Sequence, residues 1–300
     1  MASGNRPTYG GQAVIEGVMI RGQRFASIAV RRPDGTLALK CDPLSSLYTG
    51  SLRRLPLLRG VIVLIETLML GMRALTYSAN VGAEAEGDEI GKGAMAVTFA
   101  ISLTFAIGLF FLIPVLASKA VEGPLGSDLL SNLAEGLFRL AIFLAYIYLI
   151  GKMEQIRRVF MYHGAEHMTV HAQEHQDPLE IESVRKYSTA HPRCGTAFLL
   201  TVMVVAIAVF TLVGREPLWW LLASRVVLVP LVAAISYEAV RYSGFHTDNP
   251  LVRFLATPSL ALQSLTTREP DDDQIEVAIA AMEQALAADD SPVASSADQA

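Results

Sequence analysis

An uninterrupted run of 24 uncharged residues, from Ala94 to Ala117, limits the folds open to this chain more than any other feature. As an α-helix the run is about 36 Å long, at about 1.5 Å per residue. That length crosses the hydrocarbon core of a bilayer, which is about 30 Å thick. The composition agrees, because 52% of the 300 residues are hydrophobic and 18% are charged. We therefore expect a membrane protein.

Three more apolar stretches, at about 133–150, 196–213 and 218–237, predict further spans. The expected fold is mainly α, with a four-span helical membrane domain over residues 93–240 that carries a cytoplasmic insert at 152–195. Near one end of the second span, Glu135 and Arg139 are expected to extend to the membrane interface. Inside the fourth span, Arg225 is expected to have a structural partner.

The distribution of basic residues predicts the orientation. Twenty of the 24 lysines and arginines lie in residues 1–92, 151–195 and 241–300. The opposite connections carry only Lys119 and Arg215. By the positive-inside rule, we expect a multi-pass protein of the cell membrane, with both termini and the histidine-rich insert in the cytoplasm.

The first 58 residues predict a small β-rich cytoplasmic region. Strand-like segments are expected at 12–20, 26–32 and 36–40, and the last two are joined by Pro33-Asp34-Gly35, a hairpin turn sequence. In the first segment, Glu16 is expected on the solvated face. The alternative is that Glu16 or Arg21 reaches a catalytic face.

The remaining soluble parts flank the membrane domain. Residues 59–92 predict an interfacial helix and a linker, because charges recur every seven residues on an apolar background. Residues 241–288 predict a C-terminal cytoplasmic region with an amphipathic helix at 273–287. Residues 289–300 are expected to form a disordered acidic tail.

Five of the six histidines fall between His163 and His191. His163, Glu166 and His167 follow the order H-x-x-E-H, which on a helix places both imidazoles and the carboxylate on one face. Two imidazoles in this arrangement can bind one divalent ion, while the carboxylate accepts a proton from water. The pattern predicts a metal site, with zinc as the best fit and Glu166 as general base.

The third metal ligand remains open among Glu174, His191 and Cys194. A thiolate would make the site more structural, whereas a carboxylate or imidazole would make it more hydrolytic. A metal-free alternative uses Cys194 as nucleophile and His191 as base. A second copy of the pattern at His171, Glu174 and His175 is the weaker candidate, because it lies near the expected helix end.

Four motifs, in this order, resemble the YqhQ-like family of multi-pass membrane proteins: GGQAVIEGVMIRG at 10–22, YHGAEH at 162–167, HPRCGT at 191–196 and TTREPDDDQIEVAI at 266–279. The resemblance covers roughly residues 10–285. It implies a predicted metal-dependent enzyme of unknown substrate, and it does not indicate which reaction such an enzyme would catalyse.

The function we expect is therefore that of a membrane-embedded, cytoplasm-facing metal-dependent hydrolase. Its substrate would be a lipid head group or a membrane-proximal peptide at the bilayer. The alternatives are a non-catalytic scaffold or assembly protein with a structural metal, and a transporter, which the few ionisable groups in the spans disfavour. No phosphate loop, dinucleotide fingerprint or basic stripe occurs in the sequence, so no nucleic-acid partner is expected.

Overall fold

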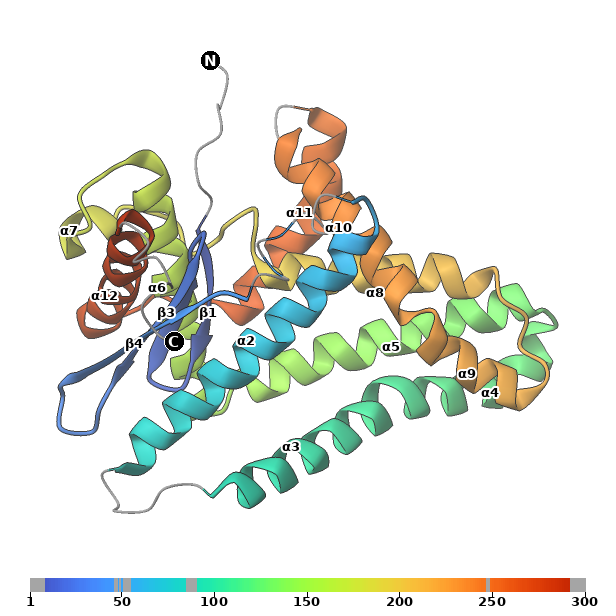
Figure 1. Cartoon of the computed structure of the whole chain (residues 1–300). Helices are drawn as coiled ribbons and strands as arrows, with labels where there is room; N and C mark the ends of the chain where they lie inside the picture. Colours follow the sequence, from blue (N-terminus) through green and yellow to red (C-terminus); the bar gives the residue numbers. More distant parts are fainter. Residues whose placement is uncertain are drawn as a thin grey trace.

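The computed structural model of the chain describes residues 9–45, 48, 50, 55–84, 91–246 and 249–291. The protein is mainly α-helical and has a small antiparallel sheet at its N-terminal end. Figure 1 shows the sheet grouped with α6 (Glu154–His175), α7 (Ile181–Val184) and α12 (Asp272–Asp290) at one end, while the longer helices extend away from them.

The sheet consists of β1 (Gly10–Val14), β2 (Gly17–Arg21), β3 (Phe25–Arg31) and β4 (Leu37–Pro43), paired in that order. The turn expected at 33–35 joins β3 to β4. The single strand expected over 12–20 is instead the β1–β2 hairpin. The chain reverses at Ile15-Glu16, where Glu16 takes a left-handed conformation with φ 49°, and the two halves of the segment pair with each other.

Helices cover both faces of this sheet. On one face, α6 and α12 pack against β1, β2 and β3 around Tyr162, Met168 and Met282. The helix α12 corresponds to the amphipathic helix expected at 273–287. The prediction of a disordered acidic tail from residue 289 onward is wrong for its first residues. Asp289 belongs to α12, and its carboxylate accepts the Gln23 N–H at 2.6 Å. The rest of that tail, 292–300, lies outside the described residues.

The opposite face of the sheet packs against α2 (Leu58–Ala83), which covers most of the region 59–92 expected to be an interfacial helix and linker. Its charges do not form a continuous solvated stripe, because only Arg73 is exposed and the other two are paired within the protein. Glu66 is buried and lies 2.9 Å from a guanidinium nitrogen of Arg21, and Arg59 is ion-paired with Glu238 of α10 (Val229–Phe245). We conclude that α2 packs between the sheet and α10. Contact of α2 with a membrane surface stays a prediction.

Within the described residues, two helical segments are long and apolar enough to cross a membrane: Gly93–Leu125 and Asp128–Ile150. The first comprises α3 (Lys92–Ile107), the π-helical turn η3 (Gly108–Leu112) and α4 (Ile113–Leu125), and the second is α5. A third is reached only by joining α9 (Leu218–Val227) to α10, which meet at 42°. The described part of the chain thus has two or three candidate spans, and the prediction of four is wrong.

Helix length and a helix break explain the lower number. The apolar stretch at 196–213 forms α8 (Gly195–Thr211), whose 17 residues extend only about 25 Å and fall short of the hydrocarbon core. The stretch at 218–237 is interrupted between α9 and α10, where Pro230 has no N–H to continue the helix. After these, α11 (Pro250–Thr266) returns the chain toward the sheet and α12.

Charged side chains inside the helical bundle form a buried ion cluster of Glu135, Arg139, Arg215 and Arg225. The Glu135 carboxylate lies 2.7 Å from Arg139, 2.8 Å from Arg225 and 3.0 Å from Arg215. Glu135 and Arg139 therefore do not extend to an interface as expected, because their charges are neutralised inside the bundle. The partner expected for Arg225 is Glu135.

Candidate metal centre

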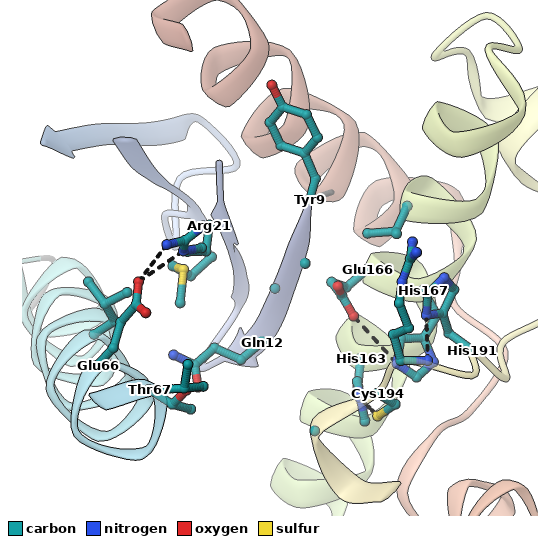
Figure 2. Close-up of a pocket in the computed structure, with 18 residues that line it drawn as sticks. Tyr9, Gln12, Arg21, Glu66, Thr67, His163, Glu166, His167, His191 and Cys194 are labelled. Carbon is teal, nitrogen blue, oxygen red and sulfur yellow. Dashed lines mark hydrogen bonds and ion pairs between the residues drawn. The ribbon is translucent and has the colours of Figure 1, made fainter. Parts of the chain in front are cut away.

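A cavity of about 330 Å³ lies where β1, α2, α6 and the turn before α8 meet. Its walls carry both ionisable and apolar side chains. Figure 2 shows one group of them, His163, Glu166, His167 and Cys194, on one side of the strand that carries Gln12, and a second group, Arg21 and Glu66, on the other side. The cavity thus extends around the outer edge of the sheet.

The imidazoles of His163 and His167 are held in one orientation by backbone carbonyls. Nδ1 of His163 lies 2.9 Å from the Thr266 oxygen, and Nδ1 of His167 lies 2.6 Å from the Thr189 oxygen. A carbonyl oxygen can only accept, so in the neutral rings each Nδ1 carries the proton and each Nε2 has the free lone pair. Both rings are therefore in the tautomer that binds a metal through Nε2.

Cys194 completes a group of three ligand atoms. Its sulfur lies 3.3 Å from Nε2 of His163, and the ligand atoms of His163, His167 and Cys194 all lie within 4.8 Å of one another. Cys194 is the N-cap of α8, and its sulfur accepts the Thr196 N–H at 3.4 Å. The sulfur thus lies at the positive, N-terminal end of the α8 dipole.

Glu166 lies beside this group and is 4% exposed. One carboxylate oxygen is 3.6 Å from Nε2 of His167. Burial raises the pKa of the Glu166 carboxyl above its ordinary value, while the imidazoles of His163 and His191 and the backbone N–H of Gly11 act in the opposite direction. A carboxyl whose pKa is raised by burial is a better proton acceptor than an ordinary carboxylate.

The structure separates the other two ligand candidates, Glu174 and His191, from this group. They lie together with His171, which was the weaker candidate in the sequence. Glu174 is already ion-paired with the Arg193 guanidinium. Nδ1 of His191 accepts the Arg193 backbone N–H at 3.2 Å, so in the neutral ring Nε2 carries the proton and faces Glu174 at 3.4 Å. This second group is therefore satisfied without an ion.

The metal-free pairing of Cys194 with His191 does not match the geometry. The imidazole within hydrogen-bonding distance of the Cys194 sulfur is that of His163. The ring of His191 instead faces Glu174, and burial lowers its pKa so that the neutral form is favoured. Glu16 and Arg21 were the two residues that could reach a catalytic face. The Glu16 carboxylate accepts a hydrogen bond from Arg158 at 2.7 Å and does not line the cavity, whereas Arg21 does line it.

Two supporting residues were missed in the sequence. Gln263 of α11 is fully buried and holds the main chain of His191, accepting its N–H at 2.8 Å and donating to its carbonyl at 2.9 Å. A glutamine within an apolar helix was the available signal. Gly164 permits the 266–268 segment to lie against α6, next to the carbonyl that orients His163.

Together, these features define a helical protein with candidate membrane spans, in which a histidine and cysteine group lines a cavity beside a small sheet. The chain belongs to the family described as "Protein of unknown function (DUF1385)", whose model matches residues 55–288. It is similar to the uncharacterized protein YqhQ of Bacillus subtilis (strain 168), with 35% identity over 294 residues, covering 93% of this chain and 92% of that protein. The family resemblance inferred from the motifs is confirmed. No solved structure matches the chain.

Proposed function

We propose that this chain is a membrane-anchored, metal-dependent hydrolase whose site is formed by His163, His167, Cys194 and Glu166. One observation carries the proposal: two imidazoles with their protons held by backbone carbonyls direct their free Nε2 atoms, with a thiol, to one place on a cavity wall. Two nitrogens and a sulfur are a donor set that zinc prefers. Three protein ligands leave one coordination position for water or substrate.

The residues present fit such an ion, because neither histidine needs to change tautomer to bind it. A zinc ion held by His163, His167 and Cys194 would supply Lewis acidity, which polarises a carbonyl oxygen and makes water more acidic. The chain's own contribution is the proton transfer. The Glu166 carboxylate would take a proton from water at Oε2 and return it to the leaving group.

We also propose that the site faces the cytoplasm, at the membrane surface. Only residues 151–153 separate the candidate span α5 from α6, so the cavity lies a short distance from the end of that span. The excess of lysine and arginine in the segments that carry the site supports the cytoplasmic side. At this depth, lipid head groups and membrane-proximal peptides are the available substrates.

Metal content of the detergent-purified protein tests the proposal. We expect about one zinc per chain in the wild type, and loss of the ion in His163→Ala, His167→Ala and Cys194→Ser, because each removes one of three ligands. His246→Ala is the matched control, because His246 is exposed and contacts its own helix at the Tyr242 carbonyl. That variant should keep the ion.

Glu166→Gln separates a base from a ligand. If Glu166 only transfers protons, the variant keeps its zinc, and turnover of any substrate falls by about 10²–10⁴. If Glu166→Gln loses the ion as fully as His163→Ala, then four protein side chains bind it. That result would replace the hydrolase with a structural metal site, as expected for a scaffold.

A further inference from the structure

The outer edge of β1 is open among the described strands. β1 pairs only with β2, and the Arg31 N–H donates to the Glu16 carbonyl, which fixes the alternation of main-chain bonds across the hairpin. By that alternation, Gly10, Gln12 and Val14 direct their main-chain groups to β2. Gly11 and Ala13 direct theirs outward, as an edge strand does.

This open edge forms part of the candidate site. The main chain from Tyr9 to Gln12 lines the same cavity as His163 and Cys194. A Cβ atom on Gly11 would stand 3.0 Å from Cγ of Glu166, so the strand and the candidate base are in direct contact. Gly10 has open space beside it, so its missing side chain leaves the edge accessible to another chain.

The charges around the cavity disfavour an anionic ligand. Of the described lining residues, the two arginines are Arg21 and Arg193, and their guanidinium groups are ion-paired with Glu66 and Glu174. Apart from the proposed zinc ion, a phosphate head group would find only these two cations in the described wall, and both already have carboxylates. A neutral ligand that is recognised through main-chain hydrogen bonds fits this wall better.

We propose that the substrate is an extended peptide segment that binds as an added antiparallel strand along the edge of β1. This inference rests on the proposed hydrolase function and assigns its substrate class. Edge strands bind peptides through main-chain hydrogen bonds, while side chains of the peptide enter adjacent pockets. Met19, Val63 and Leu70 form an apolar part of the cavity wall for such a side chain. At about 330 Å³ the cavity admits a short stretch of peptide.

The reaction is then peptide-bond hydrolysis. The oxygen of a water molecule bonds to the peptide carbonyl carbon, and the C–N bond breaks. Glu166 takes one proton from the water and delivers it to the leaving nitrogen, so the products are a carboxylic acid and an amine. Glu166 lies against Gly11, so the proton acceptor stands beside the bound main chain.

Peptide N-methylation tests the edge directly. The probe is a fluorescent pool of random octapeptides, and binding to the zinc-loaded Glu166→Gln variant is measured by anisotropy in detergent. A second pool carries an N-methyl group at every residue, which removes all main-chain N–H donors without changing charge. We expect about tenfold weaker binding of the methylated pool for each main-chain bond lost. Equal binding of the two pools would overturn the proposal.

Proline substitutions provide a matched pair on the protein side. Ala13→Pro removes an outward N–H from β1, and Leu39→Pro does the same on β4, because the Leu44 N–H bond to Arg24 places Leu39 on the outward register. We expect Ala13→Pro to weaken octapeptide binding and Leu39→Pro to leave it unchanged, with zinc retained in both. Equal weakening by both variants would contradict binding at the β1 edge.

The two proposals fail in different ways. Zinc absent from the wild type, or lost in Glu166→Gln, overturns the hydrolase whatever the peptide does. Zinc retained, with no octapeptide bound or cleaved but with glycerophosphoethanolamine hydrolysed, overturns the peptide inference alone. Cleavage of the unmethylated pool by the wild type, detected by mass spectrometry and lost in Glu166→Gln, supports both.

Discussion

Gly164 on α6 lies so close to Arg268 that a Cβ atom at position 164 would stand 2.2 Å from the Arg268 carbonyl oxygen. The Arg268 N–H also donates to the Phe160 carbonyl at 2.9 Å, which fastens this segment to α6. The same segment supplies the Thr266 carbonyl that orients His163. Contact between two backbones therefore determines the direction of one candidate ligand.

We predict that Gly164→Ala weakens zinc binding by about 10–100-fold, the usual effect of disturbing a partner that orients a ligand. The added methyl group must displace backbone, and the free energy of unfolding should fall by about 1–3 kcal/mol. The control is Gly82→Ala on α2, where the added methyl group would have no atom within 4 Å outside its own stretch of helix. Zinc titration of both variants checks this, and unchanged affinity in Gly164→Ala would show that the segment does not orient His163.

The buried ion cluster predicts an asymmetric response to mutation. Glu135 is the shared partner of three buried arginines, so Glu135→Gln leaves three guanidinium groups without a buried counter-charge. We expect this variant to lower the free energy of unfolding by about 3–5 kcal/mol. Arg139→Met should cost less, because Glu135 keeps two partners. Unfolding in detergent is the measurement, with the more exposed Glu122→Gln as control; equal losses for Glu135 and Glu122 would contradict the cluster's role.

Alkylation of thiols can report the site without a substrate. In a Cys41→Ser background, Cys194 is the remaining cysteine. We predict that iodoacetamide modifies Cys194 at least about tenfold more slowly with zinc than after chelation, because a bound thiolate is no longer a free nucleophile. Mass spectrometry of the labelled protein measures the rate. The same comparison in His167→Ala should show no protection by zinc.

Acid should weaken the contact between the β1–β2 turn and α6. A hydrogen bond from Arg158 lowers the pKa of Glu16 below its ordinary value of 4.5. The stabilisation is complete above about pH 4.5, where unfolded Glu16 is also charged, and is lost as the pH falls toward the lower folded pKa. Both side chains are partly exposed, so the effect is about 0.2–1 kcal/mol. The stability difference between wild type and Glu16→Gln should be present at pH 7 and shrink as the pH falls below about 4.5.

Membrane topology can be checked at the turn between the two candidate spans. Gly93–Leu125 and Asp128–Ile150 are joined at Gly126-Ser127, so this turn and Lys152 should lie on opposite sides of the membrane. Single cysteines introduced at Ser127 and Lys152 in a background with both native cysteines replaced should react with a membrane-impermeant maleimide from opposite sides. Labelling of both from one side would exclude a spanning hairpin.

Local patterns in the sequence were sufficient for the helix that carries His163, Glu166 and His167. Side chains three and four residues apart meet on one face wherever a helix forms, so their grouping follows from spacing alone. The hairpin turn at 33–35 and the two longest apolar helices could likewise be predicted from local sequence. In contrast, the count of spans depended on the length of α8 and on the 42° angle between α9 and α10, neither of which the apolar stretches alone reveal.

Our proposal of Cys194 as third ligand, in place of Glu174 or His191, could not be made from spacing. It follows from Arg193, whose side chain pairs with Glu174 and whose N–H bonds His191, leaving the thiol alone with His163 and His167. Such a competition between partners exists only after the loop is folded. The same holds for Glu135, which meets Arg225 across 90 residues of sequence.

The orienting partners of His163 and His167 are main-chain oxygens of Thr266 and Thr189. The orientation of the two imidazoles therefore does not depend on which side chains occupy those positions. Replacing either threonine exchanges a side chain and keeps the acceptor in place. The path of the backbone thus sets the orientation of the two candidate ligands. Relatives can differ in sequence at both positions and still share the same geometry around the cavity.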